Sequence, residues 1–449
     1  MFGMRYVLGV LLLSGCTSSS PTFPAPVDMG PADATPWPEA TVVSDGGDAG
    51  ASCVPSAVTE DDLTPAREAC SFAAGAKPSF TLRMPTAIPI KHVIVVMNEN
   101  RSFDHYLGKL GEAGKADVDG WSASFTNPDK NGVKVSPEHL SSACLSSDIP
   151  HGWTAMHAQW NDGGMNGFVT SAASDAGNGH HALGYYDQTD LPFYYWLAKT
   201  FAISDRYFSS VIGPTWPNRQ YLYMGSSYGN KSTSGTKITD EPTIFDALTK
   251  AGVSWRVYTD GSPRQDCIGW SKGHDGTAKY AEFVADLKAS TLPQVVFLDP
   301  SGDNQDEHPP NSVYTGEQWA RDVMANVVSS PLWSTTALFY TYDEAGGLAD
   351  HVPPPKACLA DPTQTAFDRL GFRVPIYVVS PWARPGYVSH RTHEHASIVR
   401  FIETVFDLGA LTARDANSDA MLDMFDFTCP ALASVPMAPE AHTGKADCK

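Results

Sequence analysis

Acidic and amide side chains that could bind a divalent cation follow two apolar segments of the sequence. They are Glu99 and Asn100 after residues 90–97, and Asp343 and Glu344 after residues 336–342. Carboxylate and amide oxygens are the hard ligands that divalent cations prefer, and the glycines behind Glu344 allow the backbone to turn. An isolated Asp-Glu pair is more often a solvated turn. A second pair of potential ligand residues, Glu99 and Asn100, follows another apolar segment, and this favours a cation site.

A hydroxyl group in a rigid turn is a candidate nucleophile. Thr215 lies between two prolines in the sequence Gly-Pro-Thr-Trp-Pro at 213–217. Proline fixes the backbone and removes an N–H donor, so we expect a stiff turn that excludes a helix. A lone threonine is usually structural, but a nearby cation could lower the pKa of this hydroxyl enough for attack. A histidine stands in a further polar cluster, His308 in DEHPP at 306–310.

These side chains need a scaffold that brings strand ends together. Short apolar runs rich in β-branched and aromatic residues predict central strands covered on both faces; they lie at 90–97, 253–260, 293–299, 336–342 and 373–380. Helical patterns lie between them, one at 243–248 and one after a predicted cap at Ser397. The alternation predicts an α/β fold, a three-layer sandwich around a mostly parallel sheet. Residues 105–240 read as a large insertion of loops and short helices over the sheet edge.

Composition excludes several classes of protein. The 449 residues are 42% hydrophobic and 18% charged, which excludes disordered chains, coiled coils and fibrous proteins. The formal net charge of −19 makes nucleic acid an unlikely partner, because like charges repel. An anionic ligand would therefore need a metal ion or a local basic pocket.

The first residues have the pattern of an export signal. Residues 1–5 form a short basic region through Arg5, residues 6–13 are apolar, and Leu-Ser-Gly-Cys at 13–16 resembles a lipobox. We therefore expect a signal peptide over 1–15 and a lipid on Cys16; the alternative is an ordinary secretory signal with a chance cysteine. Residues 17–50 are rich in Pro, Ala, Gly and Asp, which predicts an extended spacer. The chain is expected to be exported and anchored in the cell envelope, its domain facing the periplasm or the exterior.

The cysteines fit the same compartment. If Cys16 carries lipid, seven of the eight cysteines remain, enough for three disulfides and one spare thiol. We expect local pairs, Cys53 with Cys70 and Cys429 with Cys448. No C-x-x-C occurs, so a thiolate zinc site is disfavoured.

Several motifs together resemble the bacterial phosphoesterase family of the alkaline phosphatase superfamily, over about residues 85–428. The motifs are IKHVIVVMNENRSFDHYLG, HGW, GPTWPNR, DEHPP, TYDEAGGLADHVPPP and RVPIYVVSPWARPGYVSH. The family includes phospholipases C that hydrolyse phosphatidylcholine without zinc, and certain acid phosphatases. The resemblance implies an alkaline phosphatase-like catalytic domain over 85–428, after a lipid-anchored linker and lead-in over 16–84 and before a tail over 429–449.

The resemblance also implies roles for single residues. Glu99, Asn100, Asp343 and Glu344 match ligands of one divalent cation, and Asn100 also donates to the substrate. Thr215 matches the nucleophile, and His151 and His308 match histidines that line the phosphate site. His351 is a weaker candidate for substrate binding, His393 and His395 receive no role, and Arg101 is expected to brace its turn.

The resulting hypothesis is a secreted, lipid-anchored phosphoesterase. The expected reaction is cleavage of a phospholipid to diacylglycerol and a phosphorylated head group, through a metal-activated Thr215 and a phosphothreonine intermediate. The membrane is a partner through the N-terminal lipid, and the substrate is a phospholipid or a small phosphoester. A broad acid phosphatase is the alternative of the same class, and a catalytically silent surface lipoprotein is the alternative of another class.

Overall fold

The protein is described by a computed structural model of residues 36–37, 53–58, 61–85, 87–174, 176–234, 237–270, 275–302, 305–443 and 448. The chain divides into two units, residues 1–34 and 35–449, and every described residue belongs to the second. The predicted signal peptide, Cys16 and most of the predicted spacer lie outside the described residues.

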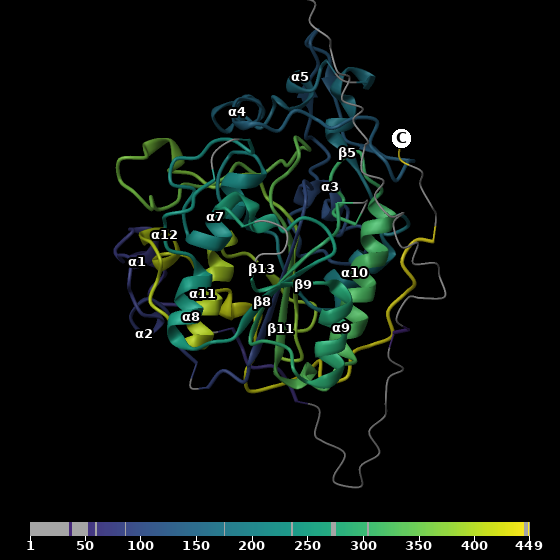
Figure 1. Ribbon diagram of the computed structural model, residues 1–449. Coiled ribbons are helices and arrows are strands. Elements are labelled where there is room, and N and C mark those ends of the chain that lie inside the picture. Colours follow the sequence, from purple (N-terminus) through teal and green to yellow (C-terminus); the bar gives the residue numbers. More distant parts are fainter. Residues whose placement is uncertain are drawn as a thin grey trace, which may run out of the picture. The chain divides into compact units, whose positions relative to one another are not determined.

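A central sheet organises this unit, with helices on both of its faces (Figure 1). Its order is β13 (Val388–Ser389), β6 (Ala202–Ser204), β12 (Ile376–Val379), β11 (Thr336–Tyr342), β1 (His92–Asn98), β10 (Val295–Asp299), β8 (Trp255–Thr259) and β9 (Thr277–Ala278). β12 runs antiparallel to β11 and to β6, whereas the other neighbouring strands are parallel. The prediction of an α/β fold with a mostly parallel sheet is confirmed.

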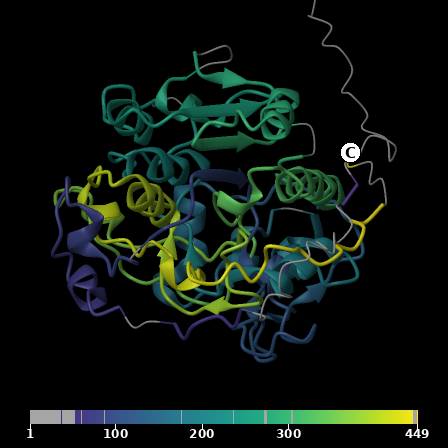
Figure 2. The same cartoon turned by 90° about the horizontal axis from the view of Figure 1, so that it is seen from below.

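The helices form layers on the two sides of the sheet. In Figures 1 and 2, α8 (Ile244–Ala251) and α11 (His395–Phe406) lie on one side, and α9 (Tyr280–Ala289) and α10 (Val313–Val328) lie on the other. Thr243 caps α8 and forms a capping box with Asp246. α11 begins three residues earlier than predicted, because Glu394 rather than Ser397 is its N-cap. The Glu394 N–H instead donates to the Ser397 hydroxyl oxygen at 3.1 Å.

The predicted insertion consists mostly of loops and short elements. They are α3 (Phe103–Leu107), β2 (Asn127–Pro128), β3 (Lys134–Val135), β4 (Glu138–His139), α4 (Trp153–Trp160), α5 (Phe168–Ser171), β5 (Gly184–Tyr185), α6 (Pro192–Thr200), β7 (Tyr207–Phe208) and α7 (Thr215–Met224). One part of the prediction is wrong, because β6 lies within this segment and joins the central sheet. Its three residues are too few for a distinct sequence pattern. The remaining elements are α1 (Thr64–Glu68), α2 (Pro78–Thr81), α12 (Ala413–Ala416) and β14 (His393–Glu394), which pairs with β7.

The register of the two central strands determines where their polar ends lie. β1 and β11 are parallel and paired from His92 with Thr336 to Asn98 with Tyr342. The residues that follow, Glu99 and Asp343, therefore leave the sheet side by side at its carboxyl edge. Every residue of β11 is buried, as its continuous apolar pattern predicts.

Three disulfides join distant parts of the chain: Cys53 with Cys429, Cys70 with Cys358, and Cys144 with Cys448. The local pairs expected from the sequence are wrong, because proximity in the fold rather than along the chain decides the partners. The expected number of disulfides is confirmed, and the remaining thiol, Cys267, is buried. In the part of the chain that the structure describes, no helix has both the length and the apolarity to cross a membrane.

Candidate active site

Four predicted ligand residues converge at the carboxyl edge of the sheet. The Asn100 N–H donates to Asp343 Oδ1 at 3.2 Å, and the Glu344 N–H donates to the same oxygen at 2.8 Å. Asn100 has a positive φ of 63°, a conformation that asparagine tolerates better than most residues. All four side chains are buried, with Glu99 the most exposed at 5%. The structure thus brings together two pairs of residues that are separated by more than 200 positions in the sequence.

An arginine links these carboxylates to the helix that carries Thr215. Arg219 Nη2 lies 3.2 Å from Glu99 Oε1, and Arg219 Nε lies 3.2 Å from Asp343 Oδ2. Thr215 is the first residue of α7, one helical turn before Arg219, so both side chains share a face of the helix. Thr215 is 8% exposed and stands at the positive end of the helix dipole, which favours a nearby anion.

The expectation that prolines exclude a helix around Thr215 is wrong. Pro214 is the N-cap of α7 and Pro217 lies in its first turn. The N–H groups of the first turn have no partner within the helix, so a proline there loses no hydrogen bond.

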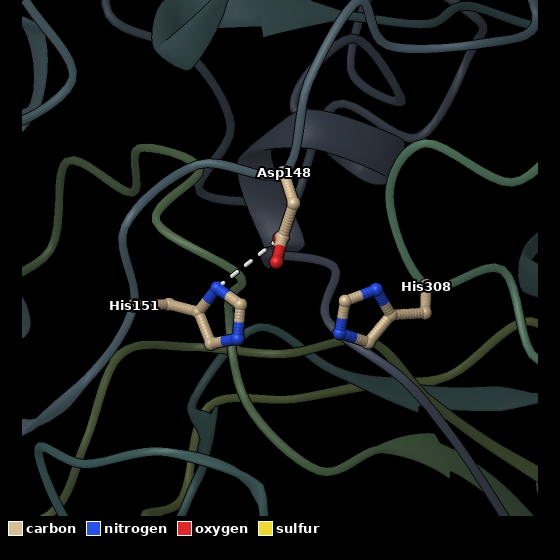
Figure 3. A group of neighbouring side chains, drawn as sticks. All are labelled: Asp148, His151 and His308. Carbon is tan, nitrogen blue, oxygen red and sulfur yellow. Dashed lines mark ion pairs between the residues drawn. The ribbon is translucent and has the colours of Figure 1, made fainter. Parts of the chain in front are cut away.

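His151 and His308 face one another beside this group (Figure 3). Their ring centroids are 5.6 Å apart. His151 Nδ1 donates to the Ile149 carbonyl at 2.6 Å, and its Nε2 lies 3.3 Å from Asn100 Nδ2 and 3.7 Å from Glu344 Oε1. His308 Nδ1 donates to the Pro309 carbonyl at 2.7 Å, which leaves its Nε2 for a ligand.

Burial and charge shift the pKa values of these groups. Burial raises the pKa of Glu344 to about 8, although His151 opposes this. Burial would lower the pKa of His151, but the Glu344 carboxylate and Asp148 outweigh it and raise that pKa to about 10. Burial also raises the pKa of Asp343. Burial would do the same to Glu99, but Arg264 and Arg219 hold its pKa below the usual range.

The donor set fits a hard divalent cation. Among the buried side-chain oxygens of the predicted ligands, Asn100 Oδ1 and Glu344 Oε1 have no hydrogen-bond partner within the described residues. An unsatisfied buried acceptor is costly, and a bound cation would remove that cost. The other two predicted ligands, Glu99 and Asp343, are paired with Arg219. Among the described residues, the acidic and histidine ligand atoms beside this edge that lie within 4.8 Å of one another belong to Asp148, His151 and His308 (Figure 3).

The structure does not place His351 with this group. Its Nδ1 donates to Asp104 Oδ2 at 2.6 Å and its Nε2 donates to Asp119 Oδ1 at 3.1 Å. Arg373 bonds both Asp104 and Asp350 in the same cluster, at 3.0 and 2.8 Å. Within the described ranges, the hydrogen bonds of the His351 ring are thus to a separate charged cluster. The chain turn at 346–347 carries the residues after Glu344 back towards α3.

Several residues with a role in the site were missed from the sequence. Arg219 could have been found, because it lies one helical turn from Thr215 within the same motif. Arg264 Nη1 lies 3.1 Å from Glu99 Oε1 and its Nη2 lies 2.8 Å from Asp306 Oδ2, which no sequence pattern signals. His395 Nε2 donates to the Asp343 carbonyl at 2.7 Å, and burial lowers the pKa of His395 to about 3, so this ring is neutral. His393 lies instead beside Asp419 and Asp423.

Glu307 anchors the segment that carries His308. It is fully buried, and its carboxylate accepts hydrogen bonds from Asn98 Nδ2 at 3.2 Å, from Tyr342 at 2.9 Å, and from Tyr106 and Tyr194. Arg101 Nε donates to the Glu307 carbonyl at 3.0 Å. Arg101 therefore holds this segment of the chain in place, which is the structural kind of role expected for it, and not a phosphate-binding role.

Comparison with known proteins identifies the family that this chain matches. A model of the Phosphoesterase family matches residues 90–409. Non-hemolytic phospholipase C of Burkholderia pseudomallei is 31% identical over 400 residues, which cover 72% of this chain but only 56% of that protein. Phospholipase C B of Mycobacterium tuberculosis is 31% identical over 77% of this chain and 80% of that protein. Non-specific phospholipase C1 of Arabidopsis thaliana is 32% identical over 73% of this chain and 69% of that protein.

Solved structures are more distant. The lipoteichoic acid synthase LtaP of Listeria monocytogenes matches 74% of this chain and 77% of its own, at 12% identity and a TM-score of 0.37. A protein in the alkaline phosphatase superfamily from Vibrio parahaemolyticus matches 70% of this chain and 77% of its own, at 10% identity and a TM-score of 0.36. Similarity at this level carries no argument about chemistry.

Proposed function

The chain belongs to the Phosphoesterase family, a family of phosphoric ester hydrolases, and on this premise we propose that it is a phospholipase C-type enzyme with Thr215 as nucleophile. It would cleave a phospholipid to diacylglycerol and a phosphorylated head group. The observation that carries the proposal is the convergence of the Glu99 and Asp343 strand ends with the first turn of α7, through Arg219. The names of the relatives favour a phosphodiester over a monoester substrate.

The side chains have complementary tasks in this reaction. A divalent cation held by Glu99, Asn100, Asp343 and Glu344 would supply the positive charge that lowers the pKa of a hydroxyl and offsets the charge of the phosphate. Thr215 loses its hydroxyl proton to water, and its Oγ1 forms the bond to phosphorus as the bond to the glycerol oxygen breaks. The first-turn N–H groups of α7 and the Nε2 of His151 donate to the phosphoryl oxygens. His308 Nε2 protonates the departing glycerol oxygen as general acid. Water then hydrolyses the phosphothreonine and restores the hydroxyl.

A substrate panel tests the reaction class. Phosphatidylcholine, sphingomyelin, phosphatidylglycerol and p-nitrophenyl phosphate are compared with and without a chelator such as EDTA. The proposal expects diester cleavage that a chelator abolishes and added divalent cation restores. Faster turnover of p-nitrophenyl phosphate than of any diester would indicate an acid phosphatase. Absence of turnover with every substrate would indicate a binding lipoprotein.

Substitution of Thr215 tests the nucleophile. Thr215→Ala removes the oxygen that forms the covalent intermediate, so we expect a loss of roughly 10³-fold or more in kcat. Thr215→Ser retains the hydroxyl and should keep measurable activity. Rapid acid quench of the native enzyme with ³²P-labelled substrate should trap phosphate on Thr215. An unlabelled Thr215 together with a fully active Thr215→Ala would contradict covalent catalysis by this residue.

Export and anchoring form a separate part of the proposal. The three disulfides support an oxidising compartment, because such bonds are rare in the cytosol. If Cys16 carries lipid, Cys16→Ser should move the chain from the membrane fraction to the soluble fraction without detergent. Equal membrane retention of the two forms would show that the lipobox pattern is fortuitous.

A further inference from the structure

An aromatic side chain borders the proposed site from two directions. Trp153 begins α4 and follows His151 by two residues. Its ring also lies against Gly213, two residues before Thr215, so closely that a Cβ on Gly213 would be 3.2 Å from the ring. The Trp153 indole is therefore held between the segments that carry a proposed phosphate donor and the proposed nucleophile. A phosphate bound by Thr215 and His151, as proposed above, would therefore lie close to this ring.

Trp153 and Phe367 form an aromatic platform that already carries a cation. Their ring centroids are 5.1 Å apart. Lys231 Nζ lies 4.7 Å from the centroid of Trp153 and 5.7 Å from that of Phe367, both within the range of a cation–π contact. Within the described ranges, the contacts of this ammonium are with rings rather than with carboxylates. Its charge is therefore not neutralised by a neighbouring acid.

The loop that carries Lys231 is fixed to the helix of the nucleophile. Asn230 Nδ2 donates to Gln220 Oε1 on α7 and to the Ser232 carbonyl, both at 3.0 Å. The Ser232 N–H donates back to Asn230 Oδ1 at 3.0 Å. Asn230 is buried, whereas Lys231 is exposed. The position of the ammonium thus depends on a defined loop conformation and not on a freely moving chain.

Aromatic platforms of this kind bind quaternary ammonium groups when they are empty. Here a protein ammonium covers the platform, so a choline head group would both compete with Lys231 for the rings and be repelled by its charge. From this geometry we infer that Lys231 is a specificity-determining residue, which favours phosphoesters with anionic or uncharged polar head groups over those with a quaternary ammonium. The inference rests on the proposed function and defines its substrate class more narrowly.

Monomeric short-chain lipids provide the kinetic test. Dihexanoylphosphatidylglycerol and dihexanoylphosphatidylcholine are compared below their micelle-forming concentrations, so that the charge of a lipid surface does not enter. The native enzyme should have the higher kcat/KM for the glycerol head group. Lys231→Met removes the charge and frees the platform, and should raise the choline-to-glycerol ratio of kcat/KM about tenfold. Lys231→Arg keeps a cation over the rings and should leave the ratio near its native value.

A binding measurement separates this inference from the proposed reaction. Dissociation constants of phosphocholine and glycerol 3-phosphate are measured by calorimetry on the same proteins, which needs no turnover. If no lipid is hydrolysed, the proposed function fails, but tighter binding of glycerol 3-phosphate that Lys231→Met reverses would still support the selection. Lys250→Met, on the exposed end of α8, controls for the loss of one surface charge. A native preference for choline, or a ratio that Lys231→Met does not change, would overturn the inference.

Discussion

Arg219 shows how one side chain can hold a charged site together. It is fully buried between Glu99 and Asp343, and these two carboxylates keep its pKa above the usual value against the effect of burial. Without the guanidinium, two buried carboxylates would lose a counter-charge, an effect that commonly costs about 3 to 5 kcal/mol. The same contact sets the position of α7 relative to the strand ends. Arg219 is therefore a positioning residue for Thr215.

The proposed role of Asp343 as a cation ligand can be tested by substitution. Asp343→Asn removes one of three carboxylates from the proposed cation site, so divalent-metal affinity and kcat/KM should fall together, each by roughly tenfold or more. Metal content after dialysis is measured by elemental mass spectrometry, next to the kinetics. Asp240→Asn, an exposed aspartate, is the matched control and should change neither quantity. Full metal content in an inactive Asp343→Asn would show that this residue acts in another way.

At the scale of elements, a charged cluster fastens the insertion to the sheet. Arg373, before β12, lies in a cluster with acidic and histidine side chains from three other segments. They are Asp104 on α3, Asp119 in the following loop, and Asp350 and His351 after β11. Burial would lower the pKa of His351, but its hydrogen bond to Asp104 and the charges of Asp104 and Asp350 outweigh it, and that pKa rises to about 9. The proton on His351 therefore stabilises the contact between these elements.

The pH dependence of stability tests this cluster. The folded pKa of His351 is above the ordinary value of 6.5, so its contribution is fully present below pH 6.5 and is lost as the pH rises through about 9. The loss is at most about 3 kcal/mol of unfolding free energy. Urea denaturation of native protein and of His351→Gln should show a difference that shrinks between pH 6 and pH 10. A difference that stays constant over this range would mean that His351 is not charged in the folded protein.

At the scale of the whole molecule, disulfides connect the two ends of the chain to the body. Cys70 and Cys358 are 288 positions apart, and Cys144 and Cys448 are 304 positions apart. Closing such long loops restricts the unfolded chain more than it restricts the folded one. The expected lead-in over 16–84 and tail over 429–449 are thus each covalently attached to the catalytic region.

Removal of one disulfide tests this contribution. The double variant Cys70→Ser/Cys358→Ser should lose about 2 to 5 kcal/mol of unfolding free energy, the range observed for native disulfides. Urea unfolding with and without a reductant is the measurement, and the variant should respond less to the reductant than the native chain. Cys267→Ala removes a cysteine that forms no disulfide and should leave the response to the reductant unchanged. Equal stability of the double variant and the native chain would rule out a stabilising role.

The sequence by itself determined the fold class and most residues of the candidate site. The nearly continuous apolar runs at 90–97 and 336–342 predicted buried strands, and polar residues at the ends of such strands are expected at a sheet edge. A local pattern also indicated Thr215 as a candidate nucleophile, and the cysteine count allowed the three disulfides that the structure contains. These features depend on residues close in the sequence, or on a count, and such signals are present before the chain folds.

Only the tertiary structure decided which distant residues meet. Several contacts join segments that are far apart in the sequence. They are the disulfides, His351 with Asp104, Arg264 with Glu99, His395 with Asp343, and Lys231 over Trp153. β6 enters the sheet with three residues because its neighbours supply the pairing, and α7 begins at Thr215 because its first turn tolerates proline. Contacts of this kind depend on strand register and loop course, which packing selects for the whole molecule at once.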